Sequence, residues 1–187
     1  MKSIVPTAPH GRDHSTDIET LRANARKDVE KGAVTENYKA DRAAVLRLLD
    51  DSLATELVCV LRYRRHYYMA GGIYAQSVAA EFLQHSIEEQ GHADLLAQRM
   101  VQLGGSPNFD PDALTKRSHA QYVPGKDLVD MIREDLIAER IAIESYSEAI
   151  RFLGDDDPTT RRLLEGILAT EEEHADDLTS LLRGQKA

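Results

Sequence analysis

Two short segments of the sequence each hold a glutamate and a histidine three residues apart. They are Glu89-Gln90-Gly91-His92 and Glu171-Glu172-Glu173-His174. Three residues are close to one turn of an α-helix, so both side chains of a pair point the same way and can bind one metal ion together. The pattern Ala-Asp-x-Leu follows the histidine in both segments. This similarity indicates that the chain contains two copies of one helical hairpin.

Two further glutamates interrupt apolar stripes of helical spacing. Glu56 lies between Ser52 and Val60 in one stripe, and Glu139 takes a similar place in a stripe of the second half. An unpaired carboxylate in a protein core costs several kcal/mol, so we expect positive charge to lie between these two side chains. Each of them precedes a glutamate and histidine pair at nearly the same distance along the chain. One such pair is a weak signal, and two in this arrangement favour a di-metal site.

The positions of glycine and proline divide the chain into four long predicted helices. They run from near 41 to the glycine pair at 71–72, over 74–103, over 127–153, and from the start signal Asp157-Pro158 to about 183. Short turns join the first helix to the second and the third to the fourth, so each pair must be antiparallel. A proline-rich segment between the pairs, with one helical turn at 113–117, can cross the length of the bundle. The predicted fold is all-α, an antiparallel four-helix bundle with one long crossover between its second and third helices.

Antiparallel helices of similar length bring their midpoints to one level. The four glutamates and two histidines lie near the middles of the predicted helices, so we expect them to converge in the core. Two divalent cations would neutralise four carboxylates, and a mixed set of carboxylates and imidazoles suits Fe(II) or Mn(II). We expect Glu89 and Glu171 to bridge the two ions. The other predicted ligands are Glu56 and His92 on one ion and Glu139 and His174 on the other.

Length and charge limit the other functions of the chain. Its 187 residues suffice for one bundle domain at 38–187, preceded by an N-terminal arm at 1–37 with a short helix over about 16–31. The net charge of -9 argues against DNA binding, since phosphate contacts need clustered lysine and arginine. The single cysteine, Cys59, cannot form an internal disulfide, and no apolar run is long enough to span a membrane. These features predict a cytoplasmic protein with no membrane partner.

Four segments around the candidate ligands carry a resemblance to a known family. They are Leu53-Ala54-Thr55-Glu56-Leu57-Val58, Glu88-Glu89-Gln90-Gly91-His92-Ala93-Asp94, Glu134-Asp135-Leu136-Ile137-Ala138-Glu139 and Glu171-Glu172-Glu173-His174. Over about 41–182 the chain resembles bacterioferritins and the bacterioferritin-like Dps-type ferritins, which are ferritin-like di-iron proteins. The resemblance implies a ferroxidase that oxidises Fe(II) with O2 or H2O2 and stores ferric mineral in a hollow shell, protecting against oxidative stress. It implies iron as the metal, with Mn or Zn as possible substitutes.

The same resemblance suggests two supporting residues. Tyr63 is expected beside the metal centre, as part of the catalytic site. Asp135, one turn before Glu139, is expected to orient a ligand histidine through the ring nitrogen that does not bind metal.

Other polar residues near the candidate ligands have simpler interpretations. His66, near the end of the first long helix, is expected at the surface. His85 is expected to be a partly exposed surface histidine, with an extra cation contact near the site as the alternative. Glu88, Glu172 and Glu173 are expected to be solvated or cavity-facing carboxylates, with guidance of iron as the alternative.

The sequence departs from the family pattern in two places. Haem-binding bacterioferritins have an axial methionine between the glutamate and histidine of the first pair, and this chain has Gln90 there, so no haem of that kind is expected. The sequence ends soon after His174, which leaves no room for the fifth helix of 24-subunit shells. A homo-oligomeric shell of 12 subunits is therefore expected rather than one of 24.

Two other kinds of function fit the same scaffold. A manganese catalase or a di-iron oxygenase would use a similar pair of metal ions, since fold does not determine activity. A Dps-type shell that shields DNA needs no enzyme activity, but the acidic balance of the chain disfavours DNA as a partner.

Overall fold

The structure is a computed structural model that describes residues 17–72 and 75–184. The chain divides into two compact units between Asn37 and Tyr38. The first unit contains helix α1, Ile18–Asn24, and a single 3-10 turn, η1, Val29–Lys31. Asp17 caps α1 by accepting hydrogen bonds from the backbone N–H groups of Glu19 and Thr20.

The helix predicted over 16–31 is therefore too long, and its first residue, Thr16, lies outside the described residues. Asp28 adopts a left-handed backbone with φ 46°, which separates α1 from η1. The apolar stripe that suggested a longer helix is exposed at Ile18, Leu21 and Val29. Short helices owe most of their stability to packing of such a stripe against other elements. Because this stripe is exposed, it does not stabilise a helix beyond Asn24.

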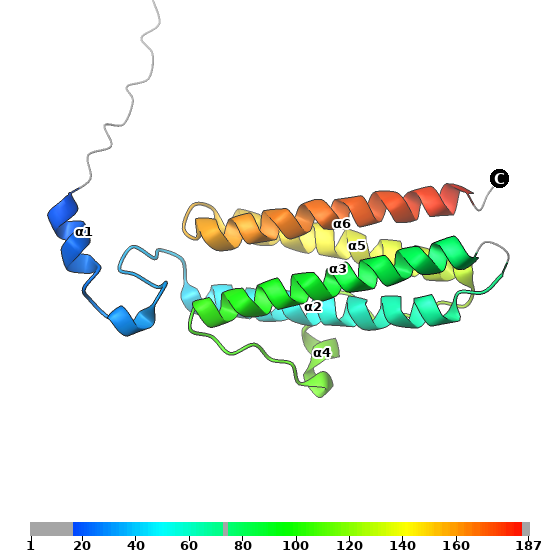
Figure 1. The fold of residues 1–187 in the computed structure, drawn as a ribbon, viewed down its shortest axis with the longest axis horizontal. Coiled ribbons are helices and arrows are strands. Elements are labelled where there is room, and N and C mark those ends of the chain that lie inside the picture. Colours follow the sequence, from blue (N-terminus) through cyan, green and yellow to red (C-terminus); the bar gives the residue numbers. More distant parts are fainter. Residues whose placement is uncertain (1–16, 73–74, 185–187) are drawn as a thin grey trace, which may run out of the picture. The chain divides into compact units, whose positions relative to one another are not determined.

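The second unit consists of four long helices and one short one. They are α2 Arg42–Met69, α3 Ala75–Gln102, α4 Pro111–Arg117, α5 Leu128–Leu153 and α6 Pro158–Gly184. Helix α2 packs against α3 and α5 against α6, and the two hairpins meet along an α2–α5 seam and an α3–α6 seam (Figure 1). No strand occurs in residues 17–72 or 75–184. The prediction of an all-α four-helix bundle with one long crossover is confirmed.

The helix ends follow the signals in the sequence. Asp41 caps α2 through the N–H groups of Ala43 and Ala44, and Asp127 caps α5. Gly104 and Gly154, within two residues of the ends of α3 and α5, take positive φ angles of 75° and 51°, which residues with a Cβ rarely adopt. The long helices therefore begin and end within a few residues of the predicted positions.

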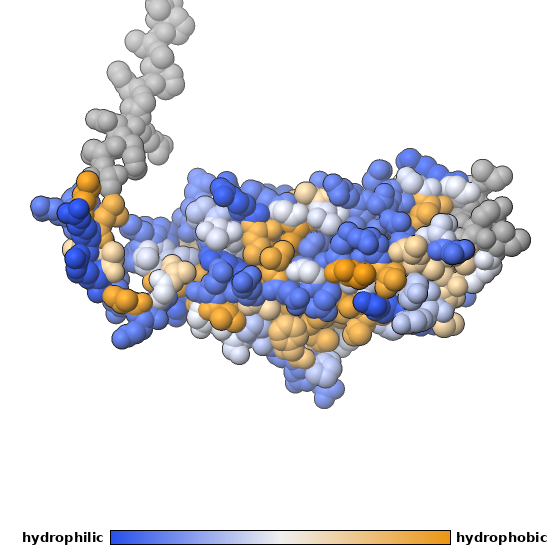
Figure 2. All heavy atoms as spheres, viewed as in Figure 1, coloured by the Kyte–Doolittle hydropathy of each residue, from blue (hydrophilic) through white to orange (hydrophobic). Residues whose placement is uncertain are grey.

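The crossover between α3 and α5 is fixed along α2. Arg117 donates to the backbone oxygens of Asp50 and Asn108 over 2.7 and 2.8 Å, and the His119 N–H donates to Thr55 Oγ1 over 2.9 Å. Helix α4 lies against α2 on this side. The crossover thus covers the α2–α5 side of the bundle, while the opposite side is the α3–α6 seam. Figure 2 shows that apolar and hydrophilic residues alternate where α3 and α6 face the viewer.

Within the described residues, no helix combines the length and the apolar character that crossing a membrane requires.

Candidate metal centre

The six residues predicted as ligands lie together in the middle of the bundle. Glu56 comes from α2, Glu89 and His92 from α3, Glu139 from α5, and Glu171 and His174 from α6. All six are buried, and His92, at 8%, is the most exposed of them. Four helices thus bring four carboxylates and two imidazoles to one level.

The first cluster of ligand atoms surrounds Nδ1 of His92. This nitrogen lies 3.4 Å from Glu56 Oε2, 3.4 Å from Glu89 Oε2 and 2.9 Å from Glu171 Oε1. Ligand atoms that are each about 2.1 Å from one ion lie about 3 to 4 Å apart. The four atoms therefore have the spacing that one small divalent cation requires.

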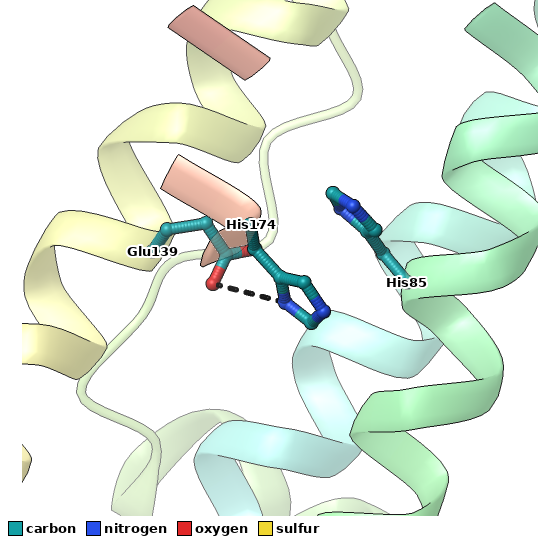
Figure 3. Close-up of side chains that lie close together, drawn as sticks. All are labelled: His85, Glu139 and His174. Carbon is teal, nitrogen blue, oxygen red and sulfur yellow. Dashed lines mark ion pairs between the residues drawn. The ribbon is translucent and has the colours of Figure 1, made fainter. Parts of the chain in front are cut away.

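The second cluster surrounds Nδ1 of His174. This nitrogen lies 3.6 Å from Glu89 Oε1, 3.5 Å from Glu171 Oε2 and 4.0 Å from Glu139 Oε2. Figure 3 shows Glu139 and His174 turned toward each other from α5 and α6. Glu89 and Glu171 each turn one carboxylate oxygen to each cluster. This is the geometry of two carboxylates that bridge two ions.

The same atoms are buried without hydrogen-bond partners. Among the described residues, the atoms in this state include Glu56 Oε2, Glu89 Oε1, Glu139 Oε2, both oxygens of Glu171, and Nδ1 of His92 and His174. Buried polar atoms almost always have a partner, so a concentration of unpaired ones calls for an explanation. Two cations at the two clusters would satisfy every one of them, so the residues present fit a pair of metal ions.

In the metal-free protein, protons carry part of this positive charge. Burial, together with the charge of Glu89, raises the pKa of Glu56 to about 8. Although burial disfavours the charged form of His92, the carboxylates of Glu171, Glu56 and Glu89 beside it raise the pKa of His92 to about 12. Burial opposes the charge of His174 in the same way, and the nearby carboxylates of Glu171 and Glu89 raise the pKa of His174 to about 10. Metal ions must therefore displace protons from these ligands.

Two tyrosines hold the outer glutamates. The Tyr63 hydroxyl donates to Glu139 Oε1, and the Tyr146 hydroxyl donates to Glu56 Oε1. Each glutamate is left with one free oxygen, Oε2, which is the atom that faces its cluster. Tyr63 therefore lies beside the predicted ligands. Tyr146 was missed in the sequence, although its spacing from Glu139 equals that of Tyr63 from Glu56.

The residue that orients His174 differs from the one expected. Glu88 Oε2 lies 2.8 Å from His174 Nε2, the ring nitrogen that faces away from the cluster. Asp135 pairs instead with His66, which is not one of the predicted ligands. Because His174 presents Nδ1 to the cluster, its outer nitrogen points to α3, where Glu88 can accept its proton. Glu88 is thus only partly solvated, while Glu172 and Glu173 are exposed as expected. In the second hairpin the position of Glu88 is taken by Thr170, which lines a groove together with His92.

Asp135 belongs to a separate buried network. It accepts a hydrogen bond from Arg62 Nε over 2.7 Å and pairs with His66 Nδ1 over 2.7 Å. The expectation that His66 lies at the surface is wrong, since none of it is exposed. The end of α2 that carries His66 is covered by the crossover, whose Pro124 oxygen lies 3.2 Å from His66 Nε2.

His85 is also buried rather than partly exposed, with 1% of its surface accessible. Its ring stacks on that of His174 with centroids 3.9 Å apart, and its Nδ1 lies 3.2 Å from the Tyr63 hydroxyl. Burial and the neighbouring charge of His174 lower the pKa of His85 to about 3, so the ring is neutral. One turn before Glu89, it shares the inward face of α3 with the ligands.

The fold and this centre agree with one protein family. The model of the ferritin-like domain matches residues 46–186, so the chain belongs to the ferritin-like family, as its motifs suggest. Bacterioferritin BfrA of Mycobacterium tuberculosis is 31% identical over 139 residues, 74% of this chain and 83% of the relative.

Solved structures place the chain in the same family. A dodecameric thioferritin, the bacterioferritin-related protein from Bacteroides fragilis, is 31% identical with a TM-score of 0.77, covering 79% of this chain and 89% of the other. A ferritin-like, diiron-carboxylate protein from Bacillus anthracis is 26% identical with a TM-score of 0.68, covering 76% of this chain and 97% of the other. The resemblance to bacterioferritins is thus confirmed.

Proposed function

We propose that the protein is a ferroxidase that oxidises Fe(II) with O2 or H2O2 and stores the ferric product inside a homo-oligomeric shell in the cytoplasm. One observation carries the proposal: Glu89 and Glu171 each offer one oxygen to each of two clusters. Two Fe(II) ions held side by side in this way can give up two electrons together. A single metal site would supply only one.

The residues have distinct roles in this reaction. Glu89 and Glu171 would hold both ions, while Glu56 with His92 and Glu139 with His174 would complete the two sites. Iron supplies the redox chemistry: two Fe(II) lose one electron each, and the pair of electrons with two protons reduces O2 to H2O2, or H2O2 to two waters. The chain contributes fixed geometry and negative charge. Tyr63 and Tyr146 each hold one oxygen of an outer glutamate in a hydrogen bond, which would leave only the other oxygen for an ion.

The relatives support iron and a shell. One similar structure is described as a diiron-carboxylate protein and another as dodecameric, and the curated relatives are bacterioferritins. We therefore favour iron over manganese and 12 subunits over 24. With Gln90 in place of an axial methionine, we expect no haem, and a Soret band from methionine-ligated haem in the purified protein would contradict this.

An anaerobic Fe(II) titration followed by oxidant tests the proposal. The wild type is expected to bind two Fe(II) per subunit and to oxidise both when O2 or H2O2 is added, in a particle whose mass corresponds to 12 subunits. Glu89→Ala should lose both ions, while Glu172→Ala, an exposed neighbour of Glu171, should behave as wild type. If Glu89→Ala oxidised Fe(II) as fast as the wild type, the assignment would fail. Peroxide dismutation by the manganese form without a mineral core would favour a catalase.

A further inference from the structure

We propose that His85, Glu81 and Asp177 form a third divalent-cation site, beside the di-metal centre and open to solvent. His85 and Glu81 belong to α3 and Asp177 to α6, so the three side chains meet across the α3–α6 seam. None of them is among the six ligands described above. The site would take a first-row divalent cation such as Fe(II), Mn(II), Co(II) or Zn(II), because one imidazole and two carboxylates suit these ions.

The spacing of the ligand atoms fits one ion. His85 Nε2 lies 3.4 Å from Glu81 Oε1 and 3.9 Å from Asp177 Oδ2. These distances lie within the range of about 3 to 4 Å expected for atoms that share one ion. All three atoms lie within 4.8 Å of one another. Three protein ligands leave further coordination positions to water.

Hydrogen bonds determine which nitrogen of His85 is free. The Tyr63 hydroxyl has one proton and donates it to Glu139, so its oxygen can only accept from His85 Nδ1, 3.2 Å away. With its proton on Nδ1, the neutral ring presents a bare lone pair at Nε2. Histidines that bind metal usually donate the other ring nitrogen in this way.

Nε2 of His85 is buried and has no hydrogen-bond partner, and the residue as a whole is only 1% exposed. It faces two carboxylates, whose oxygens repel a lone pair and cannot donate a hydrogen bond to it. A cation between the three groups removes both the repulsion and the unpaired atom. The buried, unpaired nitrogen is thus an observation independent of the acidic side chains around it.

The ring of His85 is already held in place. It stacks on His174 with an interplanar angle of 19° and meets the Tyr63 ring edge-on at 88°, with centroids 5.3 Å apart. Figure 3 shows His85 beside His174, which is a ligand of the second cluster. Binding would therefore need little reordering of this side chain, which favours affinity.

The bundle does not need a histidine at this position. In the second hairpin, the residue one turn before Glu171 is Ile167, which is also buried. The carboxylates of the proposed site are reachable from outside, since 36% of the Glu81 side chain and 56% of the Asp177 side chain are exposed. An ion can therefore enter from solvent. With fewer ligands and more solvent than the di-metal clusters, the third site should bind more weakly.

Co(II) added to the metal-free full-length protein tests the site. Calorimetry should show three equivalents per subunit, the third weaker, and crystals soaked in Co(II) should show anomalous density about 2.1 Å from His85 Nε2. The double variant Glu81→Gln with Asp177→Asn should lose this density and weaken the third equivalent at least tenfold. His85→Phe, which keeps an aromatic ring without a nitrogen, should lose the density too.

A matched control and a separate variant make the outcome decisive. Asp176→Asn makes the same charge change as Asp177→Asn, on the exposed residue next to it, and should leave all three equivalents in place. Glu89→Ala should remove the first two equivalents and keep the density at His85, so failure of the di-metal centre is distinguishable from failure of this site. The proposal is overturned if no density lies at His85 while the two clusters are filled, or if Asp176→Asn removes the third equivalent as well.

Discussion

The hydroxyl of Tyr63, on the first hairpin, donates its hydrogen bond to Glu139, on the second. Tyr146 returns the same contact from the second hairpin to Glu56 on the first. Each tyrosine lies two turns after the glutamate of its own helix, yet it holds the glutamate of the other. The two contacts therefore join α2 to α5 at the level of the metal centre.

This relationship predicts the effect of removing either hydroxyl. Tyr63→Phe frees Glu139 Oε1, and Tyr146→Phe frees Glu56 Oε1, so the glutamate concerned can turn away from its cluster. We expect metal affinity at that cluster to fall roughly 10- to 100-fold, as is usual when the partner of a ligand is lost. Calorimetric Co(II) titration measures it, and each variant serves as the control for the other cluster. Unchanged affinity in both variants would contradict the role of the hydroxyls.

Loss of Glu88 should weaken the second cluster selectively. Glu88→Ala removes the acceptor of His174 Nε2, so the ring is free to rotate and its Nδ1 is less basic. We expect roughly 10- to 100-fold weaker binding of one ion and little change in the other. The control is Glu172→Ala, an equal loss of charge on an exposed residue. Equal titration curves for the two variants would show that Glu88 has no orienting role.

The buried network around Asp135 should matter for stability rather than for metal binding. Asp135→Asn leaves the Arg62 guanidinium, which is 1% exposed, without its counter-charge. Breaking a buried ion pair in this way costs about 3 to 5 kcal/mol of unfolding free energy. Urea unfolding of the metal-free protein measures the loss. Glu165→Gln, in the exposed pair with Arg161, should cost about 0 to 1 kcal/mol. Similar small losses in both variants would contradict this prediction.

Raised pKa values predict how the stability of the metal-free protein depends on pH. The stabilising effect of protonated Glu56, pKa about 8, is lost as pH rises from about 4.5 to 8. The stabilising effect of protonated His92 and His174, with pKa values of about 12 and 10, is complete below about pH 6.5 and is lost progressively above that pH. Glu89 and Glu171, whose pKa values are lowered, remain ionised in this range.

The melting temperature of the metal-free protein should therefore fall between about pH 6 and 9. With Co(II) bound the ligands have already lost their protons, so the melting temperature should instead rise toward about pH 7 and then stay level. Thermal melts in chelator and in excess Co(II) compare the two forms. A common slope in both would show that cations and protons do not compete for these groups.

Local spacing in the sequence predicts the four long helices and the six residues of the centre. A glutamate and a histidine one turn apart must share a helix face, and glycine or proline marks the helix ends, so neither inference needs tertiary contacts. The shortened arm helix shows the limit, because its length depended on packing of Ile18, Leu21 and Val29, which the sequence cannot reveal. The division into an arm at 1–37 and a domain at 38–187 stays a prediction, as does the 12-subunit shell.

The residues that were misjudged all depend on contacts between helices. Asp135 and Glu88 both lie within one turn of a ligand along the chain, but Glu88 contacts His174 whereas Asp135 pairs with Arg62 and His66. His66 is buried because the crossover, which is distant in sequence, covers the end of α2. Spacing along one helix indicates the direction of a side chain, but it does not identify the neighbour across the core.

Glu88 in the first hairpin corresponds to Thr170 in the second. This difference makes the two candidate metal positions chemically different. A metal ion beside His174 would have Glu88 as an extra anionic neighbour, which would favour the higher oxidation state and lower the reduction potential there. The position beside His92 borders a groove instead. Two metal ions bound in one subunit would therefore fill the positions in order and have unequal potentials, although both positions come from the same repeated hairpin.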